Sequence, residues 1–143
     1  MPKHTLPRTG KSPVAFDGDL IAETKSPLYR RHLADPNEKA NWFEISVYKT
    51  VGGSYVAHVA YRWAGKLFRE VNRDHVEVSQ SIGHLLDLLA AFDSTGCVGG
   101  FPQGREFAEK QRKLLETVAE DWRLVVEDIG QKLLSQSEPE VLK

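Results

Sequence analysis

The stretch NWFEISVYKTVGGSYVAHVAYRW, residues 41–63, decides the fold class of this chain. Before the central pair of glycines, the apolar side chains of Phe43, Ile45 and Val47 recur at every second residue. The same two-residue period continues after the glycines, and it is the period of a strand with one buried face. Glycines accept the positive φ angles that tight turns require. The sequence therefore predicts an antiparallel hairpin, followed by a third strand at residues 67–71.

Helical periods replace the strand period in the second half of the chain. Apolar residues spaced by three and four predict a helix over at least residues 79–92, with Asp74 and Glu77 in capping-box spacing before it. A longer helix is predicted from residue 105 to about residue 136. Its apolar stripe consists of Leu115, Val118, Trp122, Val125, Ile129 and Leu133. Because burial of such side chains outweighs surface ion pairs, we expect packing to position this helix.

The two ends of the chain lack such periods. Residues 1–18 contain three prolines, three basic side chains and few large apolar ones, which predicts a flexible basic arm. Ser26 followed by Pro27 is typical of a helix start, so a short helix is expected up to about Ala34. Residues 137–143 are predicted to be a disordered tail.

Together these periods predict a single α+β domain over residues 19–136. Its expected sheet is a three-stranded antiparallel meander. The two C-terminal helices, of which the last is long, are expected to pack on one face of that sheet, with the short N-terminal helix beside them. A length of 143 residues is typical of one domain.

Composition narrows the environment of the protein. Hydrophobic residues make up 41% and charged residues 27% of the chain, which is ordinary for a globular protein. No apolar run approaches the roughly 20 residues that cross a bilayer, so no membrane partner is expected. No apolar segment follows the basic residues near the N-terminus, so no secretory signal is expected. A single cysteine cannot form an intramolecular disulfide, which favours the cytoplasm.

Residues 94–104, STGCVGGFPQG, raise the question of a ligand-binding loop. A phosphate-binding loop needs Lys and then Ser or Thr after its last glycine, whereas Arg105 and Glu106 follow Gly104. A dinucleotide-binding loop needs a preceding strand, whereas a predicted helix precedes this segment. Two interpretations remain. One is an anion site formed by Gly104, Arg105 and the first N–H groups of the long helix, and the other is a plain connection between helices.

Cys97 is a candidate nucleophile, with His75 or His84 as the base. These histidines, together with His58 and Asp87, also suggest a metal site, but the HExxH and CxxC spacings are missing. A thiol-dependent enzyme at Cys97 is therefore one hypothesis. Neither a metal nor another cofactor is expected.

Charge is uneven along the chain, although the formal net charge is only −1. The first 73 residues contain twelve Lys and Arg against seven Asp and Glu. Basic side chains beside strand aromatics can neutralise phosphates while the rings stack on bases. Nucleic-acid binding is therefore an alternative function, with predicted contacts at Arg62, Lys66, Arg69 and Arg73.

The favoured interpretation is a small non-catalytic interaction or regulatory module that binds another protein, most simply a second copy of itself in a homodimer. Aromatic side chains dominate protein interfaces, and twofold dimers are the commonest oligomers. Trp42, Trp63 and Phe101 are the predicted contact residues. Their availability depends on which face of the sheet the helices cover.

Overall fold

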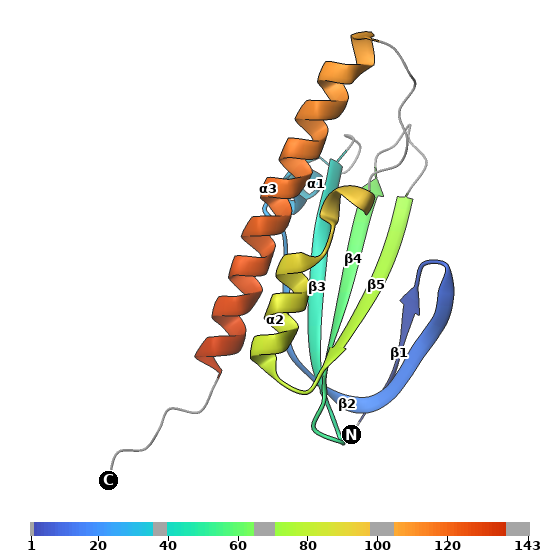
Figure 1. Cartoon of the computed structure of the whole chain (residues 1–143), viewed down its shortest axis with the longest axis vertical. Coiled ribbons are helices and arrows are strands. Elements are labelled where there is room, and N and C mark those ends of the chain that lie inside the picture. The colour runs from blue at the N-terminus through green and yellow to red at the C-terminus, as the bar shows by residue number, and fades with distance from the viewer. Residues whose placement is uncertain (1, 36–39, 65–70, 98–104, 137–143) are drawn as a thin grey trace.

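The computed structural model describes residues 2–35, 40–64, 71–97 and 105–136, and its strands form an antiparallel sheet (Figure 1). Each strand lies beside its neighbour in sequence, in the order β1-β2-β3-β4-β5. The strands are β1 (Lys3–Arg8), β2 (Lys11–Lys25), β3 (Ala40–Thr50), β4 (Tyr55–Ala64) and β5 (Val71–Ser79). The helices are α1 (Tyr29–Ala34), α2 (Ile82–Ala91) and α3 (Arg105–Ser135), with a 3-10 turn, η1 (Ser94–Cys97), after α2.

The hairpin predicted at residues 41–63 is confirmed as β3 and β4. Their register pairs Phe43 with Tyr61 and Ile45 with Val59, so these side chains share one face of the sheet. Gly53 has a φ of +88° in the turn, a conformation that glycine adopts without strain.

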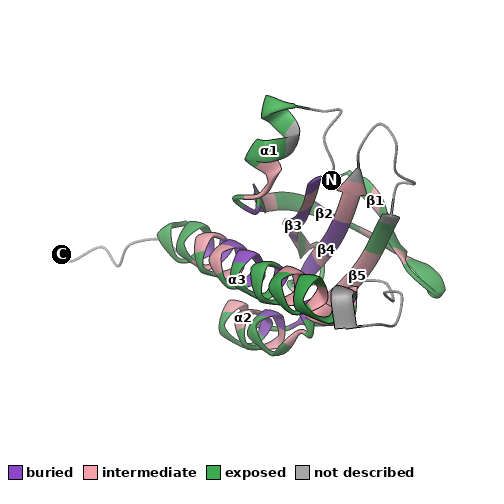
Figure 2. Ribbon diagram, turned by 90° about the horizontal axis from the view of Figure 1, so that it is seen from above, coloured by how far each residue is buried: buried purple, intermediate pink, exposed green. Residues whose placement is uncertain are grey.

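Helices α2 and α3 pack on that face and enclose the core (Figure 2). Trp122 of α3 meets Phe43 edge to face, with 5.0 Å between ring centroids, and its indole N–H donates to Leu89 O of α2 at 3.1 Å. Within the predicted α3 stripe Leu115 is half-buried, and the buried members are Val118, Trp122, Val125, Ile129 and Leu133. The long C-terminal helix is therefore confirmed. None of the helices in the described part of the chain is long and apolar enough to cross a bilayer.

The sheet has five strands rather than the predicted three, because the N-terminal segment is part of it. Residues 3–8 and 11–17 pair with each other, and β2 then continues along β3. Leu6, opposite Val14, is only 6% exposed. Pro7 lies where the β1–β2 register shifts, a position that tolerates a missing N–H. The flexible arm expected at residues 1–18 is thus corrected, because backbone pairing and a few buried side chains order a segment whose composition suggested disorder.

The end of the meander also differs from the prediction. β5 occupies residues 71–79, where the sequence predicted the end of a strand and then a helix. Residues 67–70 of that predicted strand lie outside the described residues, as does the tail predicted at residues 137–143. Asp74 and Glu77 therefore lie within a strand and form no capping box. The strand period was obscured because the helix-facing positions of β5 are polar. They are Arg73, His75, Glu77 and Ser79, which lie opposite residues 61, 59, 57 and 55 of β4.

Helix α2 begins at Ile82, later than predicted, and its N-cap is Ser81. The Ser81 Oγ accepts a hydrogen bond from His84 N at 3.1 Å, which satisfies one of the free N–H groups of the first turn. Gly83 lies in that exposed first turn, with no atom crowding the position where a Cβ would stand. The late start thus keeps this glycine out of the helix interior, where it would cost about 1 kcal/mol.

The β1–β2 hairpin folds over the other face of the sheet and meets β5, so the sheet curls into a partial barrel (Figure 1). Thr9 N donates to Asp74 O at 2.9 Å, and Asp74 N donates to Thr9 Oγ1 at 2.7 Å. Gly18 permits a close approach where β2 passes from β1 to β3, because a Cβ there would lie 2.5 Å from Lys49 O. The face opposite the helices is thereby partly covered.

Helix α1 is held against α3 by a buried carboxylate. The Ser26 hydroxyl donates to the Asp121 carboxylate, which also accepts a hydrogen bond from Leu28 N at 3.1 Å. The same hydroxyl oxygen accepts from Phe43 N at 2.8 Å. Ser26 therefore links β3 to α3 and does not cap α1, whose N-cap is Leu28.

Candidate functional site

A cavity of about 290 Å³ lies where β5, the end of α2 and η1 meet. Ligand sites typically combine apolar walls with a few convergent polar groups, and this cavity has both. It is here called the η1 cavity, and it is lined by Val59, Tyr61, Arg73, Asp74, His75, Phe92, Asp93, Gly96 and Cys97.

Strand register builds one wall of the η1 cavity. Direct pairing across β4 and β5 sets Arg73 opposite Tyr61 and His75 opposite Val59, on the face that the helices cover. Side chains opposite each other in an antiparallel pair have Cβ atoms about 4.5–5.5 Å apart. The register therefore gathers a cation, a phenol and an imidazole at one edge of the core.

The residues that follow α2 build the other wall. The Asp93 carboxylate accepts hydrogen bonds from Thr95 Oγ1 at 2.7 Å and from Gly96 N at 3.3 Å, which shapes η1. Phe92 stacks on His75 with 4.7 Å between ring centroids, so the two walls are in contact. The hydrogen bonds from Thr95 and Gly96 hold the pKa of Asp93 below its usual range, and the group is ionised at neutral pH.

Tyr61 is a fully buried residue of the cavity lining. The residue is 0% exposed, and its hydroxyl has no hydrogen-bond partner among the described residues. Burial raises the pKa of Tyr61 to about 12, so the group is a neutral donor at physiological pH. Asn41 opposes part of that rise, yet no hydrogen bond of normal geometry joins the two side chains, and the Asn41 amide nitrogen also has no partner in the described part of the chain. An unpaired buried hydroxyl costs about 1–3 kcal/mol.

Cys97 and His75 line the same cavity, as the thiol-enzyme hypothesis requires, but their chemistry does not match it. The pKa of Cys97 is raised to about 11, chiefly by burial and also by the Asp93 carboxylate, while Arg73 opposes both effects. The nucleophile in thiol catalysis is the thiolate, which is scarce at neutral pH with such a pKa. His75 Nε2 lies 2.6 Å from Glu77 Oε1, so this nitrogen is already engaged. The cavity therefore holds a neutral thiol without an activating base.

Arg73 brings a free positive charge to the mouth of the η1 cavity. Its guanidinium makes no ion pair within the described part of the chain, and the residue is exposed. Arg73 and Asp93 act on the Cys97 thiol in opposite directions, so the two charges both lie within electrostatic reach of this side chain. The lining of the η1 cavity thus includes one positive charge, on Arg73, and one negative charge, on Asp93.

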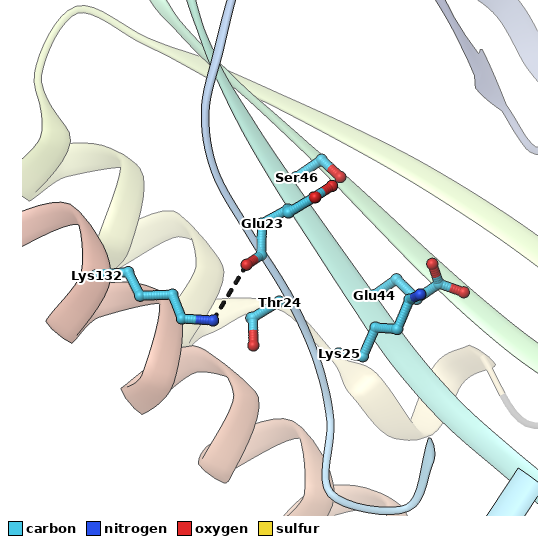
Figure 3. A pocket seen from close by; sticks show the side chains of 6 residues that line it. All are labelled: Glu23, Thr24, Lys25, Glu44, Ser46 and Lys132. Atoms are coloured by element: carbon cyan, nitrogen blue, oxygen red, sulfur yellow. Dashed lines mark hydrogen bonds between the residues drawn. The ribbon is translucent and has the colours of Figure 1, made fainter. Parts of the chain in front are cut away.

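A second pocket, of about 320 Å³, lies at the edge of β2 (Figure 3). Its polar groups already bind one another or their neighbours. Lys132 Nζ donates to Glu23 O at 3.2 Å, and the Glu44 carboxylate accepts from Trp42 Nε1 at 3.0 Å. The bond from Lys132 to Glu23 joins α3 to the edge of the sheet. The pocket is lined by Glu23, Thr24, Lys25, Glu44, Ser46 and Lys132. The η1 cavity, with an unpaired hydroxyl and a free cation, is the stronger candidate.

The predicted protein-contact residues that the structure describes lie on opposite faces of the sheet. Trp42 is 6% exposed, since it packs against Tyr29 at 5.3 Å between ring centroids on the face away from α2 and α3. Trp63 is partly buried and packs against the helix-covered core. Phe101 lies outside the described residues. No single surface therefore presents both tryptophans.

The predicted nucleic-acid contacts are divided in the same way. Arg62 lies opposite Asn72 and Arg73 opposite Tyr61, so the two guanidinium groups leave opposite faces of the sheet. Arg62 donates to the Asp74 carboxylate at 2.9 Å, which balances its charge. Lys66, Arg69 and Gly104 lie outside the described residues, and for Arg105 the structure describes only the backbone, at the first residue of α3.

The histidines considered as metal ligands are dispersed. His58 Nε2 lies 2.8 Å from Asp74 Oδ1 on the face away from α2 and α3, whereas His75 lies on the helix-covered face. His84 Nδ1 lies 2.8 Å from Ser79 Oγ at the start of α2. Over the residues that the structure describes, no three His, Cys, Asp or Glu side chains are grouped to hold a metal ion.

Sequence reasoning did not identify Tyr61, Phe92 and Asp93 as site residues. Residues 93–96, Asp-Ser-Thr-Gly, carry a usable signal, because Asp and Thr side chains in such runs bond to nearby backbone and favour turns. That signal would have placed the end of α2 correctly. The partnership of Tyr61 with Arg73 has no comparable signal, because it depends on the register of β5.

The side chains of the η1 cavity carry the functional inference, because a fold alone does not determine function. No protein-family model matches this chain, and no curated protein or solved structure matches it significantly.

Proposed function

We propose that this protein is a non-catalytic binding module that holds a small organic ligand in the η1 cavity. The observation that carries the proposal concerns Tyr61, which lines the cavity and whose buried hydroxyl has no hydrogen-bond partner among the described residues. A ligand atom that accepts this hydrogen bond removes the cost of the unpaired group. The bond itself contributes about 0.5–1.5 kcal/mol more.

The apolar wall supports the same proposal. Phe92 stacks on His75 and also contacts the Trp122 ring, with 5.0 Å between centroids, so it is held from two sides. A wall that is fixed before binding reduces the ordering cost that a ligand must overcome. A cavity of about 290 Å³ is at the lower end of the range for drug-sized ligands, which favours a small one.

The non-catalytic part of the proposal rests on Cys97. Its pKa of about 11 keeps the thiol protonated, and the imidazole of His75, which lines the same cavity, binds Glu77. A binding site tolerates a neutral thiol, whereas nucleophilic catalysis requires an activated one. The cysteine therefore serves the cavity as a small apolar side chain.

The homodimer, nucleic-acid and cytoplasmic hypotheses remain predictions. Trp42 and Arg62 already interact with Glu44 and Asp74, so these two candidates are committed to contacts within the chain. Ligand binding in the η1 cavity is compatible with association through another surface.

Labelling of Cys97 tests the proposal, because the chain has one cysteine and that residue lines the cavity. We expect compounds from a library of small polar molecules to raise the melting temperature and to slow alkylation of Cys97 by iodoacetamide at pH 9. Both effects should follow the same saturation curve, since a ligand stabilises only the folded state. A library in which no compound slows labelling would contradict the proposal.

Tyr61→Phe separates binding in the cavity from binding elsewhere. The variant keeps the ring but loses the hydroxyl, so it should weaken the binding of any such ligand by roughly tenfold. A change of that size corresponds to the loss of one hydrogen bond near the upper end of its usual free energy. Tyr55→Phe is the matched control, because Tyr55 shares β4 and the core-facing side but does not line the cavity. Equal weakening in both variants would place the ligand elsewhere.

A further inference from the structure

We propose that the ligand of the η1 cavity is a small zwitterion of the α-amino acid class, held through its carboxylate by Arg73 and Tyr61 and through its ammonium group by Asp93. This inference rests on the proposed function, since it names the chemistry of the ligand in the same cavity. It is carried by the charged side chains of Arg73 and Asp93, which both line the cavity, and by the Tyr61 hydroxyl, which has no hydrogen-bond partner among the described residues.

The carboxylate end follows from the β4–β5 register. Arg73 and Tyr61 face each other directly across the two strands, and both line the cavity. Neither has a partner for its donor groups in the described ranges: the Tyr61 hydroxyl has no hydrogen bond, and the guanidinium has no ion pair. A planar carboxylate accepts hydrogen bonds from a guanidinium and from a hydroxyl at the same time. We therefore assign the carboxylate of the ligand to these two donors.

The ammonium end follows from the geometry of η1. Thr95 Oγ1 and Gly96 N both donate to Asp93 Oδ1, which leaves Oδ2 without an intramolecular donor in the described residues. A Cβ at residue 96 would lie 3.3 Å from Oδ2, so the glycine keeps open the space beside this oxygen. An ammonium group of the ligand fits there, because it can donate to an ionised carboxylate.

The remaining charges of the wall disfavour other ligand classes. Asp74 is already shared by His58 and Arg62, so it offers no free charge to a cation. Arg73 is the one cation of the described lining without an ion pair, and Asp93 is an ionised carboxylate of the same lining, so a doubly charged anion such as a phosphate ester would lack a second positive partner. Phe92 and Val59 leave an apolar wall for the side chain of the ligand.

Titration with free amino acids tests the inference. Each of the twenty L-amino acids is added separately to the full chain, and binding is followed by calorimetry and by protection of Cys97 from alkylation. We expect at least one to bind saturably, and its carboxamide and its N-acetyl derivative to bind at least about tenfold more weakly. Loss of a hydrogen bond to a charged group has an effect of that size.

Two charge variants assign the ends of the ligand. Arg73→Gln should weaken binding of the free amino acid about tenfold but leave the affinity for its carboxamide unchanged. Asp93→Asn should weaken binding of the free amino acid but leave the affinity for its N-acetyl derivative unchanged. Asparagine retains an oxygen for Thr95 and Gly96, so η1 is preserved. Arg30→Gln is the control, since Arg30 is an exposed arginine outside the cavity. Gly96→Ala should weaken binding, because the added methyl group fills the space beside Asp93. The backbone can accept alanine there, because Gly96 does not have a positive φ.

The outcomes separate this inference from the proposed function. If the carboxamide and the N-acetyl derivative bind as tightly as the free amino acid, the assignment of a zwitterionic ligand is wrong. If no amino acid binds while a neutral compound protects Cys97 and depends on Tyr61, the cavity is a binding site for another class of ligand. If neither amino acids nor the library protects Cys97, both proposals fail.

Discussion

Asp121 and Tyr61 are both buried polar side chains, but they differ in their hydrogen bonding. Asp121 is 3% exposed, and its carboxylate accepts hydrogen bonds from Ser26 and Leu28. Tyr61 is 0% exposed, and its hydroxyl has no partner among the described residues. A paired buried group fastens two parts of a fold together. A buried group that stays unpaired beside a cavity instead marks a place where a ligand can supply the missing bond.

The largest effect is expected from removing the paired group. Asp121→Ala leaves the Leu28 N–H and the Ser26 O–H without their acceptor, and each unsatisfied buried donor costs about 1–3 kcal/mol. The urea midpoint should fall, and α1 should detach from α3, which tryptophan fluorescence of Trp42 beside Tyr29 can report. Asp121→Asn is the control, because an amide oxygen still accepts one bond. An unchanged urea midpoint in Asp121→Ala would show that the Asp121 carboxylate does not stabilise the contact between α1 and α3.

Removing the unpaired group is expected to have the opposite sign. Tyr61→Phe deletes a buried hydroxyl that has no partner in the described ranges, so the free energy of unfolding should rise by up to about 1–3 kcal/mol. Tyr55→Phe should change it by less than about 0.5 kcal/mol, because Tyr55 is only partly buried and its hydroxyl is not a buried unpaired group. Urea unfolding of both variants measures the difference. A loss of stability in Tyr61→Phe would mean that the hydroxyl is bonded in the free protein, and the comparison with Asp121 would collapse.

A more gradual effect is expected at alkaline pH. The pKa of Cys97 is raised from 9.0 to about 11 and that of Tyr61 from 10.0 to about 12, in both cases chiefly by burial. Above pH 9 the unfolded chain therefore loses these protons before the folded chain does, so it binds fewer protons. Stability from these groups is complete below pH 9 and falls as the pH rises toward 12. Chemical unfolding between pH 8 and 11 should show this decline, and it should be weaker in the double variant Cys97→Ser, Tyr61→Phe.

The smallest effect is expected from exposed charges on α3. Arg123 donates to Glu120 at 2.6 Å and Glu127 at 3.2 Å, but all three side chains are more than half exposed. Water and salt screen such pairs. Arg123→Gln should leave the urea midpoint unchanged within error. A clear shift would mean that surface charge, as well as packing, positions this helix.

Local periodicity predicted those parts of the fold whose inward positions are apolar. Phe43, Ile45 and Val47 alternate with polar residues and form β3 as expected, and the α3 stripe from Val118 to Leu133 is buried. A period is a property of neighbouring residues, so it can be recognised without knowing what lies across the core. These elements supply the helix-covered side of the sheet.

Periodicity failed where the inward positions are polar, and the candidate site lies there. The core-facing side of β5 carries Arg73, His75 and Glu77, because part of it faces the η1 cavity rather than a packed helix. Such exceptions to local rules are expected at functional sites. Periodicity did not predict the N-terminal strands for a different reason. Leu6 and Val14 are isolated among prolines and charged residues, and only their pairing with each other reveals a strand.

The sequence by itself thus determined the central hairpin, the long amphipathic helix and the α+β class, because each follows from the spacing of apolar residues along one segment. Only the tertiary structure decided that five strands close into a partial barrel, and that Tyr61, Arg73 and Asp93 meet at one cavity. The physical reason is that these contacts join residues far apart in the chain, and their energies come from pairing register and burial, which no local pattern records.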